Sequence, residues 1–201
     1  MTEIHSKIGA SSMSRWSKCP GSVALSKGIE STSSRYAEEG SDAHAFAALC
    51  LAMKKHAGYY VGKKMEYAGR QFCADAEMAE HVQVYLDTIY LGLTADDTMV
   101  FEHKFDLSEV HPGLFGTADA VTWKPKERLL IVDDFKYGAG IPVEVEGNPQ
   151  LMYYALGALL ASNYPARTVR MRICQPRCDH PKGPVRHHDI DAIDLVDFKA
   201  D

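Results

Sequence analysis

Two aspartates and a lysine near the middle of the chain have the spacing of a metal-dependent catalytic site. Asp119 closes the run Gly116-Thr117-Ala118-Asp119, and Lys136 follows Asp134 by two residues. A turn predicted over residues 124–127 places Asp119 opposite residue 133 or 134 of the next strand. Directly opposite Cβ atoms lie about 4.5–5.5 Å apart, so the two carboxylates can hold one cation. Oxygen ligands of this kind suit Mg²⁺.

Strand alternation decides which neighbours share this face. Asp134 and Lys136 emerge together, whereas Asp133 points to the other face. Asp133, and Glu102 on the preceding strand, could still join or support the site, or simply be solvated. The pattern also fits an ordinary salt-bridged hairpin. The apolar neighbours Val132 and Phe135 predict a buried strand, where a carboxylate needs a partner or a metal.

The surrounding elements follow from periodicity and capping residues. Apolar residues at helical spacing predict helices over 36–56 and 73–91, the first with Ser34 as its N-cap, and Asn148-Pro149 begins a third that ends near 162. Period-two patterns predict strands at 99–107, 114–123, 129–136, 168–175 and 185–190. Three consecutive strands without crossover helices indicate a mixed α/β (α+β) sheet.

Two further features lie on the predicted helices. Gly40 and His44 form a G-x3-H pattern early in the first long helix. Gln150 and Tyr154 are four residues apart, so they share one face of the third helix. Alone, the histidine is more often structural, and the Gln/Tyr pair more often packs on a sheet.

Taken in order, G-x3-H, G-x-x-D, D-x-K and Q-x3-Y resemble the RecB-like branch of the PD-(D/E)XK nuclease superfamily. The resemblance is closest to phage- and prophage-encoded exonucleases. These also carry an S-x-x-x-R-W-x-x-C-P-G-S segment, which matches residues 11–22 here. The match spans about residues 11–176. Two departures are the Ala118 that stands where the superfamily name has proline, and aspartate rather than glutamate at position 134.

The resemblance implies a role for each matching residue. Asp119, Asp134, the main-chain carbonyl of Phe135 and His44 would bind Mg²⁺ or Mn²⁺. Lys136 would position and help deprotonate the attacking water. Gln150 and Tyr154 would complete the catalytic set by orienting DNA or bracing the site from their helix.

The same resemblance implies a restriction-endonuclease-like αβββαβ core with an N-terminal helical extension. We expect a single domain over residues 1–201, with a helical N-terminal part (1–70), a catalytic core (71–176) and a C-terminal extension (177–201). The expected activity is metal-dependent hydrolysis of linear double- or single-stranded DNA, most simply by an exonuclease of phage replication or recombination. An inactive DNA-binding or assembly module of this fold and another metal-dependent phosphohydrolase are the alternatives. A single-strand annealing protein is a partner suggested by the resemblance alone.

Charge is distributed unevenly along the chain. The 201 residues carry a net charge of −5, and 46% are hydrophobic, which excludes disordered and fibrous classes. Between residues 165 and 188 basic residues dominate, and four arginines are candidate DNA contacts: Arg167, Arg170, Arg172 and Arg177. A second basic group follows the first long helix: Lys54, Lys55, Lys63, Lys64 and Arg70. Each group could instead be a solvated charged edge.

Cysteine usage and the absence of long apolar runs predict the compartment. Five cysteines form no even framework and suggest free thiols in a reducing cytoplasm, that of a bacterial host. Cys19 stands where a related nuclease could place the first ligand of an iron–sulfur cluster, but the remaining cysteines are poorly spaced for one, and we expect none. No stretch is long enough to span a bilayer or to serve as a secretory signal, so we expect no membrane association.

Overall fold

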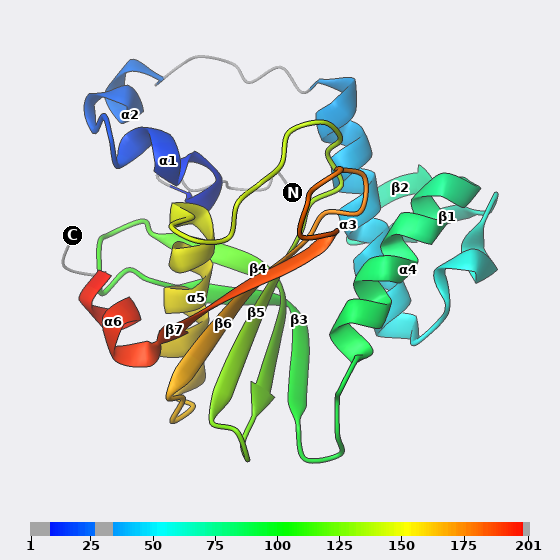
Figure 1. Ribbon diagram of the computed structural model, residues 1–201. Coiled ribbons are helices and arrows are strands. Elements are labelled where there is room, and N and C mark those ends of the chain that lie inside the picture. Colours follow the sequence, from blue (N-terminus) through cyan, green and yellow to red (C-terminus); the bar gives the residue numbers. More distant parts are fainter. Residues whose placement is uncertain (1–8, 27–33, 199–201) are drawn as a thin grey trace.

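The computed structural model describes residues 9–26 and 34–198 and shows a mixed α/β fold built on a five-stranded sheet (Figure 1). The sheet order is β3-β4-β5-β6-β7, with β5 and β6 parallel and the other neighbouring strands antiparallel. The strands are β3 (Thr98–Asp106), β4 (Phe115–Lys124), β5 (Leu129–Phe135), β6 (Thr168–Cys174) and β7 (Val185–Asp191).

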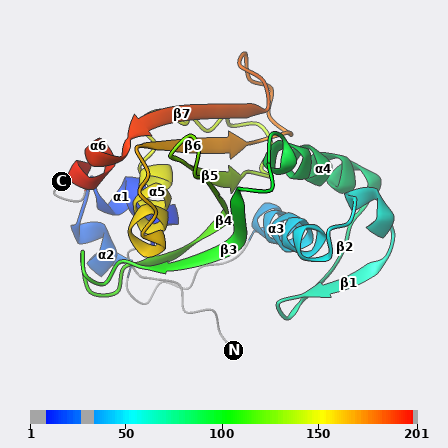
Figure 2. The same ribbon diagram turned by 90° about the horizontal axis from the view of Figure 1, so that it is seen from below.

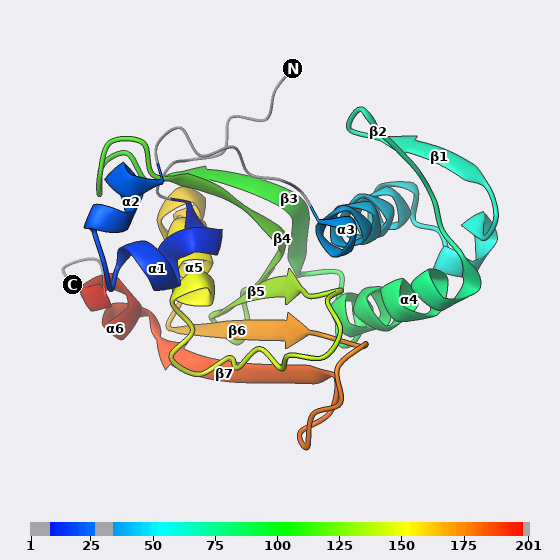
Figure 3. The ribbon, with the colours of Figure 1, turned by 90° about the horizontal axis from the view of Figure 1, so that it is seen from above.

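Helices cover both faces of this sheet (Figures 2 and 3). On one side α5 (Pro149–Ser162) packs on β4 and β5, flanked by the short elements of the N-terminal segment and by the C-terminal helix. On the other side α3 (Arg35–Met53) and α4 (Ala76–Tyr90) pack together against one end of the strands. The short helical elements are η1 (Ala10–Ser12), α1 (Met13–Trp16), α2 (Gly21–Leu25), η2 (Ala57–Tyr60) and α6 (Ala192–Asp197).

The main predicted elements are confirmed within a few residues at each end. Ser34 caps α3 by accepting a hydrogen bond from the Ala37 N–H, and Asn148 caps α5 by accepting from Gln150 and Leu151. The turn between β4 and β5 spans residues 125–128, so Lys124 pairs with Leu129 and Ala120 with Asp133. This pairing therefore agrees with the predicted alternation of side chains between the two faces of the sheet.

Two boundaries differ from prediction. Residues 64–73 form a small hairpin, β1 (Lys64–Tyr67) and β2 (Arg70–Cys73), so the first 70 residues are not purely helical. The second long helix begins only at Ala76, because Asp75 supplies its N-cap by accepting from the Met78 N–H. The C-terminal extension carries the predicted strand β7, which pairs with β6 along its whole length.

The core lies on the two faces of the sheet. One cluster joins α5 to residues such as Leu130, Val132 and Met171, and the other joins α3 and α4 to Phe135 and Tyr137. Phe105 wedges so tightly between β4 and α5 that a Cβ at Gly157 would lie 2.2 Å from its ring and one at Gly116 would lie 2.7 Å away. The glycine of the G-x-x-D run therefore serves close packing.

Candidate functional site

The two aspartates lie side by side where β4 separates from β5. The β4–β5 ladder ends at the Ala120–Asp133 pair, so Asp119 and Asp134 occupy the next position in register. Asp119 replaces the lost ladder bond, because its Oδ2 accepts the Phe135 main-chain N–H at 2.7 Å. The side chain of Asp134 is 5% exposed and that of Asp119 is 19% exposed. The predicted pairing of carboxylates is thus present.

A strained position on the neighbouring strand lies beside this separation. Glu102 stands opposite Asp119 in the β3–β4 register, between the pairs Phe101–Ala120 and His103–Ala118. Its φ of 49° is in the left-handed region, which residues other than glycine seldom adopt. Such conformations concentrate at functional sites, where the surrounding structure holds them in place. Glu102 also lines a cavity of about 10 Å³ with His44 and Asp119.

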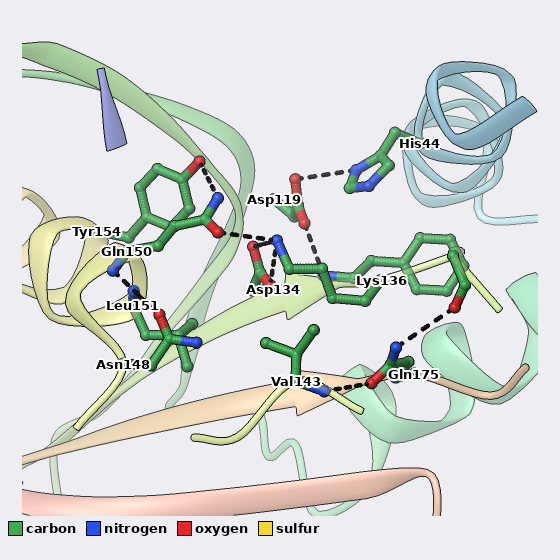
Figure 4. Close-up of polar contacts among 12 residues, drawn as sticks. His44, Asp119, Asp134, Lys136, Val143, Asn148, Gln150, Leu151, Tyr154 and Gln175 are labelled. Carbon is green, nitrogen blue, oxygen red and sulfur yellow. Dashed lines mark hydrogen bonds and ion pairs between the residues drawn. The ribbon is translucent and has the colours of Figure 1, made fainter. Parts of the chain in front are cut away.

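His44 reaches this site from α3, as Figure 4 shows. Its Nδ1 lies 3.2 Å from Asp119 Oδ1, across 75 residues of sequence. Burial alone would lower the pKa of His44, but the Asp119 carboxylate outweighs burial and raises this pKa to about 9. Burial opposes ionisation of Asp119 in turn, yet His44 and the Phe135 N–H together lower its pKa below the ordinary value. The pair is therefore an ion pair at neutral pH.

Lys136 lies on the other side of the carboxylates and is held by α5 (Figure 4). Its Nζ donates to Asp134 Oδ1 at 3.1 Å and to Gln150 Oε1 at 3.2 Å. Gln150 in turn donates from Nε2 to the Tyr154 hydroxyl at 3.1 Å. The helical spacing of Gln150 and Tyr154 thus produces a chain of side chains that fixes the ammonium group beside Asp134.

Asp134 carries the clearest sign of an unsatisfied site. Its Oδ2 is buried and has no aligned hydrogen-bond donor among the described residues, although Lys136 Nζ lies 2.9 Å away. Burial raises the pKa of Asp134, Lys136 counteracts this, and the nearby Asp119 adds repulsion, which leaves the value at about 6. Two adjacent carboxylates, one of them with a buried oxygen that lacks an aligned donor, are suited to a cation.

The donor set fits a hard divalent ion only if it includes main-chain or water oxygens. Within residues 9–26 and 34–198, no three His, Cys, Asp or Glu side chains form a group that could hold a metal by themselves. Asp119 and Asp134 supply two carboxylates, and Phe135 contributes a main-chain carbonyl at the same strand end. Mg²⁺ commonly takes one or two carboxylates and completes its shell with other oxygens.

Asp133 lies on the opposite face of the sheet, as alternation predicts. Both of its oxygens accept from Arg172, with Nη2 at 3.0 Å from Oδ2. The Asp133 side chain is 1% exposed, and burial raises its pKa in spite of the arginine. Asp133 therefore forms a buried ion pair behind the strand that carries Asp134.

The candidate DNA-binding arginines are mostly paired with carboxylates. Arg172 is bound to Asp133, and Arg170 makes two hydrogen bonds of 2.7 Å to Asp189. Arg170 and Arg172 share one strand face, but it is the face away from Asp134 and Lys136. Arg177 contacts Glu39 and Glu77 and stacks on Tyr137. Arg167, just before β6, is exposed.

Two residues at this site escaped the sequence reasoning. Gln175 is 2% exposed and binds the loop after Lys136 by donating to the carbonyls of Gly138 and Ile141. It also accepts a hydrogen bond from the Val143 N–H (Figure 4). In the sequence, the only sign of this role is that a polar residue follows a strand of buried character.

The second residue is Tyr85 of α4. It stacks on Phe135 at 4.7 Å and lines the same small cavity as His44 and Glu102. Its hydroxyl is buried without a hydrogen-bond partner in the described part of the chain. Its position in an apolar helical stripe predicts only core packing.

The N-terminal motif segment packs beside this region. Met13 is buried in the cluster around α5, and the Trp16 indole N–H donates to the Gly9 carbonyl at 3.2 Å. η1 and α1 both contact α5, the helix that carries Gln150 and Tyr154. The segment therefore supports the helix that positions Lys136.

A family profile matches residues 5–199, almost the whole chain. The chain belongs to a family of proteins of unknown function (DUF2800). Because the match extends from the N-terminal motif segment to the end of α6, the elements that carry His44, the two aspartates, Lys136 and Gln150 all lie within the family's common region. Membership in this family does not assign an activity.

The free cysteines are dispersed over the fold. Cys50 and Cys174 are buried, and burial raises the pKa of each thiol to about 12. Cys178 is also buried, whereas Cys19 and Cys73 are exposed.

None of the described helices is long and apolar enough to cross a membrane.

Proposed function

We propose that this protein is a divalent-metal-dependent nuclease of the PD-(D/E)XK superfamily, RecB-like branch, that hydrolyses phosphodiester bonds in DNA. The observation that carries the proposal is the convergence of Asp119, Asp134, Lys136 and His44 at the separation of β4 from β5. The order α4, β3-β4-β5, α5, β6 supports a restriction-endonuclease-like αβββαβ core.

Asp119, Asp134 and the Phe135 carbonyl would hold Mg²⁺ or Mn²⁺, with His44 beside Asp119. A bound ion of this kind lowers the pKa of its water and polarises a phosphoryl oxygen. The buried Asp134 Oδ2, which has no aligned hydrogen-bond donor among the described residues, fits such an occupant. So does the raised pKa of Asp134, which comes from burial first and from repulsion by Asp119 second.

Lys136 supplies a compact positive charge next to these carboxylates. Its ammonium group can orient a water for attack and offset the negative charge that grows on the phosphate. Gln150 holds the ammonium in place, and Tyr154 holds the Gln150 amide. Loss of Gln150 would therefore weaken the reaction less than loss of Lys136, because it acts through Lys136.

The substrate we propose is linear DNA, and an exonuclease of phage replication or recombination is the most specific form of the proposal. Cytoplasmic location and cooperation with a single-strand annealing protein belong to the same proposal. An inactive DNA-binding module predicts binding without cleavage, and another phosphohydrolase predicts cleavage of nucleotides instead.

The test compares wild type with Asp119→Ala and Lys136→Ala on linear double-stranded and single-stranded DNA, with Mg²⁺ or Mn²⁺. Lys104→Ala, an exposed lysine of β3, is the matched control. We expect wild type and control to degrade DNA, the two site variants to lose at least a hundredfold in rate, and EDTA to stop the reaction. Covalently closed circular DNA should resist an exonuclease. Intact DNA with wild type in every condition would refute the proposal.

A further inference from the structure

A compact basic surface lies between α3 and β1, outside the site described above. Residues 54–64 contain four lysines, one histidine and two tyrosines but no aspartate or glutamate. The segment thus carries a charge of +4 within a chain whose net charge is −5. Five exposed residues form what we call the lysine–tyrosine surface: Lys54, Lys55, Tyr59, Lys63 and Lys64.

The backbone of this segment is fixed, so the positions from which its lysines extend are held in place. The Ala57 N–H donates to Gln83 Oε1 of α4 at 2.9 Å, and the Gly62 N–H donates to the Ala74 carbonyl at 3.0 Å. Tyr60 packs edge-on against Phe46 of α3, with ring centroids 6.1 Å apart. A preorganised surface loses little conformational freedom on binding a ligand.

Two of the four lysines of this surface have an aromatic neighbour. Lys63 Nζ lies 3.5 Å from the centroid of the Tyr59 ring, and Lys55 Nζ lies 5.7 Å from it. Tyr59 itself is 59% exposed. In the part of the chain that the structure describes, none of the four lysines forms an ion pair. Arg70, which the sequence groups with them, is instead bound to Glu38 and Asp42.

This pairing pattern distinguishes the two basic groups of the chain. The charges of Arg170, Arg172 and Arg177 are offset by aspartates and glutamates within the fold. The lysine–tyrosine surface keeps its charge available to an external anion. Lys54 and Lys55 also lie at the C-terminal end of α3, where positive charge stabilises the helix, but Lys63 and Lys64 lie at no helix end.

We propose that the lysine–tyrosine surface binds the phosphate backbone of DNA outside the catalytic site. This inference rests on the proposed function. The cyan segment that bears the surface lies on the far side of α3 and α4 from the sheet (Figures 1 and 3). α3 links the two regions: Lys54 follows His44 by ten residues, which is about 15 Å along a helix. That distance corresponds to about four phosphates of one B-form strand. The surface therefore engages a stretch of DNA separate from the bond that is cut.

The test measures binding of fluorescently labelled duplex and single-stranded 30-mers by anisotropy, in EDTA, from 50 to 200 mM salt. Lys55→Gln/Lys63→Gln is compared with Lys18→Gln/Lys104→Gln, which removes two exposed lysines elsewhere. We expect the first variant to bind about tenfold more weakly at 50 mM salt, and the control to stay within twofold of wild type. The slope of log K against log salt should fall by about 0.9 per lost duplex contact, or 0.7 for a single strand.

Three results would overturn the inference: equal weakening in both double variants, wild-type binding that neither variant changes, or binding to vesicles of phosphatidylserine and phosphatidylcholine without binding to DNA. Hydrolysis of bis(p-nitrophenyl) phosphate with Mn²⁺ tests the catalytic site alone, because so small an ester does not reach the lysine–tyrosine surface. This assay therefore distinguishes a failure of the surface to bind DNA from a failure of the proposed nuclease function. Lysine-dependent DNA binding without hydrolysis of any substrate supports the surface and refutes the nuclease. Hydrolysis together with unchanged DNA binding in Lys55→Gln/Lys63→Gln supports the nuclease and refutes the surface.

Discussion

Replacing Asp134 by asparagine should stabilise the metal-free protein while abolishing the proposed nuclease activity. In the folded chain the pKa of Asp134 is about 6, against an ordinary value of 3.8, because burial and Asp119 disfavour the charged form more than Lys136 favours it. The difference of 2.2 corresponds to about 3 kcal/mol at 1.36 kcal/mol for each pKa unit. Ionised Asp134 therefore destabilises the folded state by about that amount above pH 6. Asparagine has nearly the same shape and carries no charge.

The pH dependence of this effect has a definite sign. A folded-state pKa above the unfolded value means that the penalty is complete above about pH 6, shrinks as the pH falls, and vanishes below about pH 4. We expect Asp134→Asn to raise the free energy of unfolding by about 1–3 kcal/mol at pH 8 in EDTA. The variant and wild type should converge near pH 4.

Urea denaturation followed by tryptophan fluorescence, at pH 8, 7, 6 and 5, measures the difference. Asp106→Asn, an exposed aspartate at the end of β3, is the control and should change little at any pH. Adding Mn²⁺ should stabilise wild type but not Asp134→Asn, since a ligand that binds only the folded state raises stability. A variant that is less stable than wild type at pH 8 in EDTA would refute the reasoning.

Three further predictions concern the rest of the fold. Gly157→Ala should destabilise the protein by about 1–3 kcal/mol in chemical denaturation, despite the better helix propensity of alanine, because the new Cβ meets the Phe105 ring; Phe105→Leu in the same chain should relieve part of that loss. Arg172→Leu should cost about 3–5 kcal/mol by leaving Asp133 buried and unpaired, and adding Asp133→Asn should recover stability; equal stability of single and double variants would contradict this. Iodoacetamide at pH 8 should modify the exposed thiols of Cys19 and Cys73 in the native protein. It should spare the buried thiols of Cys50 and Cys174, whose pKa is about 12, and mass spectrometry identifies the modified residues.

Local signals in the sequence account for much of the fold. Ser34 and Asn148 cap helices by short-range hydrogen bonds, and period-two patterns mark the strands of the sheet. The β1–β2 hairpin escaped this reasoning because its turn uses Ala68 and Gly69, both with positive φ. Such turns ordinarily favour Asn, Asp or Gly, so alanine at the first position hides the signal.

For the site, the sequence by itself determined the paired carboxylates and the lysine. A short turn fixes the register of β4 against β5, and a side-chain period of two then places Asp119 and Asp134 together and sends Asp133 to the opposite face. These relations depend on residues close in sequence, which is why a pattern can reveal them. The helical spacing of Gln150 and Tyr154 is local in the same sense.

Only the tertiary structure decided which distant groups meet. His44 reaches Asp119 because α3 packs against the end of the strands, and Gln175 holds the loop after Lys136 because β6 pairs with β5. Charge availability is equally a tertiary property. The sequence shows two basic groups of similar appearance, but folding pairs Arg170 and Arg172 with carboxylates and leaves Lys55 and Lys63 beside an exposed tyrosine. The composition gives the number of charged residues, whereas the packing of the chain determines which of these charges can bind a partner.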